Sequence, residues 1–265
     1  MTKRLIRFFP VESSRIPYIL FGVLMIANSI LCMTSNSWSA YTSSRSYFEL
    51  VLCQTDDSMN QLFQFSYLAA LVYFQLGHAT NWQCYASIRY PSRWHWLMRY
   101  IGIVLNTTLA FELIIFVTPL FMAFSTHLSF ANEWSAMSNY VPIDHLTPLS
   151  ATLLSAALSG MRFFSQGLAV LLFNLLFTKL AIGAASILLI SCVIEARIFN
   201  FFPHFPPYLI PLYHSTLRGI QNTPFESNRL SYTTSFIVLL AIVVLMIGGL
   251  FVVIARYDFF SKKSR

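Results

Sequence analysis

Four polar side chains stand inside long apolar runs of this sequence and are its best candidates for chemistry. Glu112 lies about 18 Å along the apolar run that begins at Tyr100, near the middle of a membrane if that run is a helix. Arg162, Gln166 and Asn174 fall within an arc of about 120° on one helix. Such groups usually face a bundle interior or a water-filled path, so we expect them to line a pathway or to join helices. Simple helix packing is the alternative explanation.

Familiar catalytic motifs are missing from the chain. It has no GxxxxGK[ST] phosphate loop, no HExxH, no GxSxG and no Rossmann glycine pattern. Its six histidines are scattered and its four cysteines form no CxxC pair, so no metal site is predicted. We therefore expect neither an enzyme nor a cofactor bound to this chain.

Composition indicates the solvent that surrounds the chain. Of 265 residues, 56% are hydrophobic and only 10% are charged, against about 25% charged in an average soluble domain. Too few charged side chains are present to cover a soluble protein, so an integral membrane protein is predicted. The net charge of +7 is spread between apolar runs rather than gathered on one face, so it indicates membrane topology and no nucleic-acid partner.

The apolar runs predict an all-α membrane protein with six transmembrane helices in a single domain over residues 1–265. Residues 149–198 are apolar for about 50 positions, which suits two crossings that break near Lys179. The predicted spans are residues 17–34, 61–77, 100–124, 160–177, 180–198 and 232–255.

The basic residues orient these spans. With the N-terminus inside, most of the 17 Lys and Arg residues fall on the cytoplasmic side, as the positive-inside rule requires. Both termini are therefore expected in the cytoplasm, in a multi-pass protein of a bacterial inner or plasma membrane. Residues 199–230 would lie outside, where their prolines and aromatics favour short re-entrant or interfacial helices.

The sizeable cytoplasmic loop, residues 77–99, reads GHATNWQCYASIRYPSRWHWLMR. Pro91 disfavours helical geometry at Tyr90, which gives a physical reason for any helix in this loop to stop there. An interfacial aromatic belt with basic topology determinants is the plainer interpretation.

In its position, its WQCYASIRYPSR stretch and the surrounding topology, this loop resembles the first cytoplasmic loop of ABC-2 type ABC-transporter permeases. The resemblance implies two permease chains, identical or paralogous, above two separate ABC ATPase subunits that carry ATP and Mg. Residues 80–88 would then form a short amphipathic coupling helix between spans two and three, with Thr80 or Asn81 as its N-cap, docked in an ATPase groove. The implied ATPase-coupling residues are Trp82, Gln83, Tyr85, Ile88, Arg89, Pro91 and Arg93.

We therefore expect the transmembrane subunit of an ATP-driven exporter of a hydrophobic or amphipathic substrate, such as a peptide, lipid or drug. Two rival hypotheses remain. One is a membrane-embedded enzyme that uses Glu112 and a histidine as an acid/base pair. The other is a non-catalytic sensor or assembly protein that binds a partner through the aromatic loop.

Overall fold

The computed structural model describes residues 16–34, 46–56, 58–81, 92–126, 128–134, 146–176, 214–215 and 231–256. Helices make up 91% of these residues and none of them forms a strand, so the predicted all-α class is confirmed for this part of the chain. The helices are α1 (Ile16–Thr34), α3 (Tyr47–Asp56), α4 (Ser58–Asn81), α6 (Arg93–Thr126), α7 (Pro148–Leu176) and α12 (Tyr232–Arg256).

Three of these helices, α6, α7 and α12, are long and apolar enough to cross a membrane. Two more contain shorter apolar stretches, Ile16–Asn28 in α1 and Phe63–Leu76 in α4. The structure thus supports a membrane protein, and helices lie at five of the six predicted spans. The remaining predicted span, residues 180–198, lies outside the described residues.

Helix α7 begins at Pro148, so the predicted start of the fourth span at residue 160 is wrong. The reason is local. Thr147 caps the helix, since its Oγ1 accepts the backbone N–H of Ser150 at 3.4 Å, and Pro148 follows at the first helical position. Proline is favoured there because its missing N–H would have no helical partner. This Thr-Pro start adds three turns to the helix and brings more polar residues into it.

Helix α3 lies in a segment that was expected to be a loop. Ser46 and Glu49 form a capping box: the Ser46 N–H donates to Glu49 Oε2 at 3.1 Å, and the Glu49 N–H donates to Ser46 Oγ at 3.4 Å. The helix packs against the end of α6, where the Tyr47 hydroxyl donates to the carbonyl oxygen of Phe116 at 2.7 Å. Burial raises the pKa of this hydroxyl. Pro119 removes the N–H that would bond to the carbonyl oxygen of Ile115, so the bond to the adjacent carbonyl of Phe116 lies in the turn where α6 has one helical hydrogen bond fewer.

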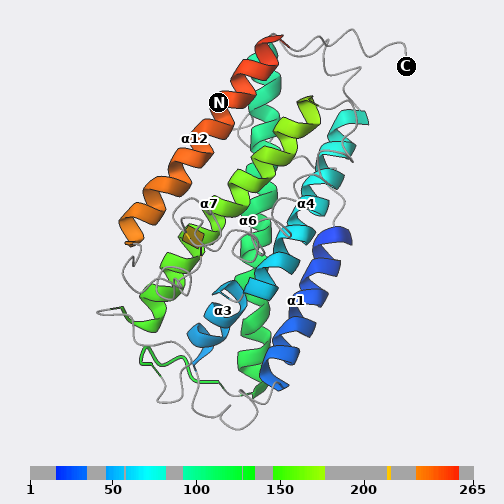
Figure 1. Cartoon of the computed structure of the whole chain (residues 1–265). Coiled ribbons are helices and arrows are strands. Elements are labelled where there is room, and N and C mark those ends of the chain that lie inside the picture. The colour runs from blue at the N-terminus through cyan, green and yellow to red at the C-terminus, as the bar shows by residue number, and fades with distance from the viewer. Residues whose placement is uncertain are drawn as a thin grey trace, which may run out of the picture.

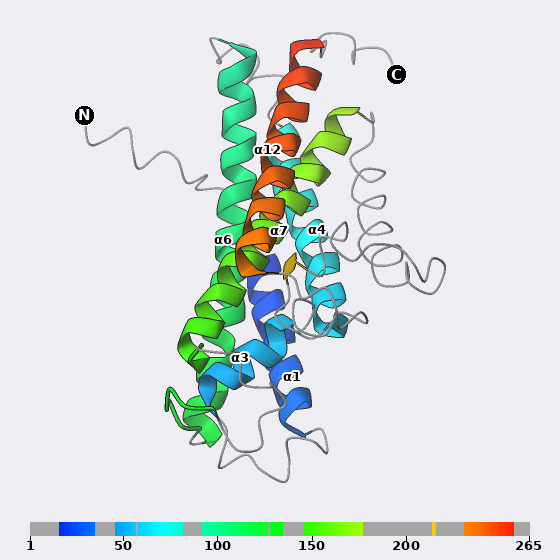
Figure 2. The same ribbon diagram turned by 60° about the vertical axis from the view of Figure 1, so that its left-hand side comes forward.

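The bundle is organised around α7 (Figure 1), which packs against α3, α4, α6 and α12. Helix α12 lies along one side of α7 in both views, and α1 packs mainly on α6 (Figure 2). Helix α6 runs antiparallel to α7, as the order of colours along each helix shows. The buried face of α7 therefore lies against neighbouring helices.

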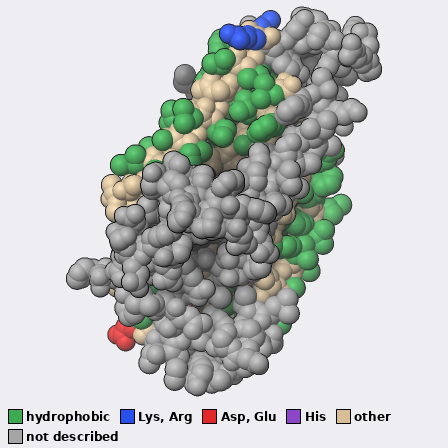
Figure 3. Space-filling view, in the orientation of Figure 1, with side chains coloured by type: hydrophobic (Ala, Val, Ile, Leu, Met, Phe, Trp, Pro, Cys, Tyr) green, Lys and Arg blue, Asp and Glu red, His purple; other side chains and the backbone are tan. Residues whose placement is uncertain are grey.

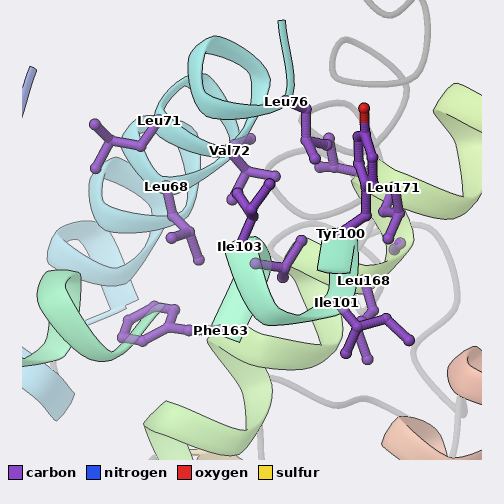
Figure 4. Close-up of a cluster of buried hydrophobic side chains, with 14 of the residues drawn as sticks. Leu68, Leu71, Val72, Leu76, Tyr100, Ile101, Ile103, Phe163, Leu168 and Leu171 are labelled. Atoms are coloured by element: carbon purple, nitrogen blue, oxygen red, sulfur yellow. The ribbon is translucent and has the colours of Figure 1, made fainter. Parts of the chain in front are cut away.

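Apolar side chains from α4, α6 and α7 interlock on one side of α7. Leu68, Val72 and Leu76 of α4 meet Ile103 of α6 and Leu171 of α7 in one cluster (Figure 4). The helices approach closely at Gly167 of α7, where a β-carbon would lie 2.6 Å from Cγ1 of Val104. Such close packing holds the inner face of α7 in a fixed register against its neighbours.

Candidate functional site

The inner face of α7 carries a row of buried polar side chains. From residue 152 to 166 they recur at alternating steps of three and four, the spacing that places residues on one side of a helix, over about 21 Å. Asn174, about two turns further on, extends the row to about 33 Å, close to the thickness of a membrane's hydrocarbon core. We call it the polar seam, and it consists of Thr152, Ser155, Ser159, Arg162, Gln166 and Asn174.

At its first turns the polar seam faces α3. The Thr152 hydroxyl lies 3.3 Å from the carbonyl oxygen of Phe48 and 2.8 Å from that of Pro148 in its own helix. One step further on, Ser155 Oγ lies 3.0 Å from Thr55 Oγ1 of α3. This part of the seam joins two helices through hydroxyl groups.

Glu112 of α6 meets the polar seam near the middle of both helices. Its Oε1 lies 2.7 Å from Ser159 Oγ, and a β-carbon at Gly160 would lie 3.6 Å from the same oxygen. The other carboxyl oxygen, Oε2, is buried and has no hydrogen-bond partner in the part of the chain that the structure describes. A β-carbon at Gly160 would be in ordinary van der Waals contact with this carboxyl, so α6 and α7 lie close together here.

Arg162 lies fourteen residues from each end of α7 and is only 3% exposed. Its guanidinium lies 4.2 Å from the centre of the Phe65 ring of α4, a cation–π contact, and its Nη1 donates to Ser215 Oγ at 3.4 Å. Gln166, one turn further, donates from Nε2 to the carbonyl oxygen of Phe65 at 3.4 Å. Here the polar seam faces α4.

Two residues between α7 and α12 in the sequence, His214 and Ser215, also reach the bundle interior. Both are fully buried. Ser215 contacts Arg162, and His214 Nδ1 lies 3.0 Å from Ser235 Oγ of α12. Sequence reasoning did not select either one, because nothing in a Pro-rich segment shows which polar residues fold back onto the helices.

The predicted polar residues Glu112, Arg162, Gln166 and Asn174 therefore lie in one interior, and Glu112 contacts the polar seam at Ser159. Sequence reasoning missed Thr152, Ser155 and Ser159. Their three-and-four spacing with Arg162 and Gln166 is the signal that would have found them, had the helix been started at Pro148.

Most of the predicted coupling segment lies outside the described residues: Trp82, Gln83, Tyr85, Ile88, Arg89 and Pro91. Helix α4 continues through Thr80 and Asn81, so the prediction that one of them is the N-cap of a separate short helix is wrong. Ser92 then caps α6, since its Oγ accepts the N–H of His95 at 3.4 Å. Arg93 donates from Nη1 to the carbonyl oxygen of Ala255 at 3.0 Å, which ties the start of α6 to the end of α12.

Charge is segregated between the two ends of the bundle. Arg93 and Arg99 lie at the start of α6, beside Arg256 at the end of α12. Glu49 lies on α3, and Glu133 follows α6 at the other end. Among the described atoms in Figure 3, basic groups appear at one end of the face, an acidic group at the other and hydrophobic groups between them.

Chemically, the site offers hydroxyl, amide, guanidinium and carboxyl groups along one line. Among the described residues, no three His, Cys, Asp or Glu side chains gather to hold a metal ion. The described arrangement suits hydrogen bonding to polar groups, within the bundle or on a solute that passes through it. Comparison with protein-family models, curated proteins and solved structures gives no match.

Proposed function

We propose that this chain is the membrane subunit of an ATP-driven exporter of the ABC-2 type. The observation that carries the proposal is the polar seam, which runs along the most enclosed of the long helices. Burying polar groups in a membrane protein is costly, and they usually mark a pathway for a solute or ion. A row of such groups about 33 Å long is what a route across the hydrocarbon core requires.

The connection between α4 and α6 supports coupling to an ATPase. Residues 82–91 join the end of α4 to the start of α6, and both helices contribute groups that face the polar seam. A partner that pulls on this segment would therefore move both helices against α7. Trp82, Tyr85 and Arg89 of the segment are the proposed contacts for the ATPase subunit, which would carry the ATP and Mg.

The proposed topology follows from the separation of charge. The end with Arg93, Arg99 and Arg256 would face the cytoplasm, where positive residues are retained and the ATPase binds. Both termini would then be cytoplasmic, with six spans and the acidic end outside the cell membrane. The buried pair His214 and Ser215 is consistent with a re-entrant segment before α12.

The remaining assembly is proposed from the sequence resemblance. Two permease chains, identical or paralogous, would stand in the lipid bilayer above two ATPase subunits. The substrate class would be hydrophobic or amphipathic, because a polar seam bordered by apolar side chains can hold the polar part of such a molecule.

Purification of the tagged full chain from its native membrane in mild detergent tests the proposal. We expect an ABC ATPase subunit to be recovered in stoichiometric amount, with ATPase activity. The double variant Trp82→Ala/Arg89→Ala should lose the ATPase. The matched variant Trp94→Ala/Arg99→Ala should keep it, because it removes the same residue types from exposed positions on α6.

Recovery of the chain without any ATPase would overturn the proposal and favour a sensor or assembly protein. Equal loss of the ATPase in both double variants would also count against it, since coupling would not then depend on residues 82–91. Turnover of a lipid or peptide by the purified chain alone would favour the enzyme hypothesis.

A further inference from the structure

The contact between Glu112 and Ser159 has chemistry that a polar pathway does not by itself require. Glu112 is the twentieth residue of the 34 in α6, so it lies about 28 Å along the helix from its start and about 21 Å from its end. An ionised carboxylate at that depth needs several donors or a cation, because burying an uncompensated charge costs far more than burying a neutral group.

The surroundings of Glu112 supply one donor. Ser159 Oγ lies 2.7 Å from Oε1, and no described residue forms a hydrogen bond with the buried Oε2. On α1, the Phe21 ring stacks on the Phe111 ring, and the Tyr18 hydroxyl donates a hydrogen bond to Thr107 Oγ1 at 3.4 Å rather than to Glu112. On α12, Leu239 packs with Leu158 beside this region.

Arg162 is the charged side chain one turn beyond Ser159. Its guanidinium lies over the Phe65 ring and donates to Ser215, so it is engaged on the α4 side of the helix. Among the described residues, Glu112 forms no ion pair. The carboxyl therefore meets hydroxyl and apolar groups.

The hydrogens around Ser159 can be assigned. Ser159 Oγ has two neighbours, Glu112 Oε1 at 2.7 Å and the carbonyl oxygen of Ala156 at 3.3 Å, but the hydroxyl carries a single hydrogen. If the carboxyl is ionised, that hydrogen goes to Oε1 and Oε2 keeps buried charge without a donor. If Oε1 carries a proton, it donates to Ser159 Oγ, which donates in turn to Ala156. Both contacts of Ser159 Oγ are then hydrogen bonds with a hydrogen of their own, and Oε2 is a neutral carbonyl oxygen.

We propose that Glu112 and Ser159 form a proton-binding site at the centre of the bundle, with the proton on Oε1 of Glu112. A metal cation does not fit this position. Hard cations take about six or more oxygen ligands, and here the carboxyl and one hydroxyl are the oxygens brought together. The inference goes beyond the proposed export function and does not depend on an ATPase.

Infrared spectroscopy of the full chain in lipid vesicles at neutral pH tests the inference, because the C=O stretch of a protonated carboxyl is separate from the bands of a carboxylate. The wild-type chain should show a protonated-carboxyl band that is lost in Glu112→Gln. The matched variant Glu133→Gln removes an exposed carboxyl outside the helices and should leave that band unchanged.

Ser159→Ala gives an independent reading if Glu112→Gln does not fold. Removal of the hydroxyl should keep the band and shift it to higher wavenumber, because the carboxyl loses its acceptor. Absence of the band from the wild-type chain would overturn the inference. So would a band that appears only in Ser159→Ala, since the native carboxyl would then be ionised.

Discussion

Helices α7 and α12 lie side by side and are both long and apolar enough to cross a membrane, yet they use their side chains in opposite ways. Of the most apolar stretch of each helix, 61% is buried in α7 and 22% in α12. Helix α7 buries Ser159, Arg162 and Gln166, whereas α12 exposes large apolar residues such as Leu240, Val244 and Leu245. The more apolar helix is thus the outer one.

This difference follows from the solvent. In lipid, an exposed Leu or Val side chain meets hydrocarbon as apolar as itself, whereas an exposed polar group loses its hydrogen bonds. Polar residues are therefore kept inside, where neighbouring helices satisfy them. The comparison teaches that the polar groups of a span, more than its apolar ones, indicate which face lies in the bundle interior.

An arginine placed on the outer face of α12 should have the largest effect. Val244 is the thirteenth of the 25 residues in α12 and is 59% exposed, while Arg162 is central in α7 and buried. Val244→Arg should destabilise the inserted chain by about 3 kcal/mol, since its charge would face hydrocarbon. The yield of folded protein in the membrane and its thermal unfolding in detergent measure the effect.

Thr233→Arg is the matched control, because it places the same charge at an exposed position near the start of α12. A long basic side chain there can reach the membrane surface, so little change is expected. If Val244→Arg were as stable as this control, the outer face of α12 would not be in contact with lipid.

A methyl group added to the inner face of α7 should have an intermediate effect. A β-carbon at Gly167 would lie 2.6 Å from Cγ1 of Val104, a buried side chain with few alternative rotamers. Gly167→Ala should therefore cost about 1–3 kcal/mol of unfolding free energy. Thermal or SDS-induced unfolding of the purified chain measures it.

Gly248→Ala on α12 is the matched control for Gly167→Ala, because no atom lies within 4 Å of the added β-carbon. We expect no loss of stability there. The second substitution Val104→Ala should restore part of the stability lost in Gly167→Ala, because it removes the atom that the new methyl meets. Equal effects at the two glycines would mean that α7 is packed no more closely than α12.

The smallest effect is expected for a single hydroxyl contact of the polar seam. Thr55 and Ser155 lie 3.0 Å apart between α3 and α7. A double-mutant cycle with Thr55→Val and Ser155→Ala should give a coupling energy of about 0.6 kcal/mol, the usual value for a hydrogen bond between membrane helices. A coupling energy of zero would leave the first turns of the seam without a role in holding α3 on α7.

Local signals in the sequence explain which elements were predictable. The apolar runs located α1, α4 and α12 to within four residues at each end, since each is bounded by charged or polar groups. The end of α6 was located to within two residues, but α6 begins at Arg93, seven residues before the predicted start. Helix α3 was missed because it is short and half polar, although Ser46 and Glu49 carry a capping box. The start of α7 was placed too late because the apolar run 149–198 was divided into two crossings of about membrane thickness around Lys179, and the helix cap at Thr147 was not used.

The sequence by itself determined the helical class of the described residues, the apolar character that would let three helices cross a membrane, and the position of each polar residue along its helix, because these depend on composition and on distance along the chain. Helix spacing also placed Arg162, Gln166 and Asn174 on one side of α7. Only the tertiary structure decided that this side faces α3, α4 and α6, that Glu112 meets Ser159, and that His214 and Ser215 join them. A helix can be rotated about its axis at little local cost, so close packing against its neighbours decides which groups meet.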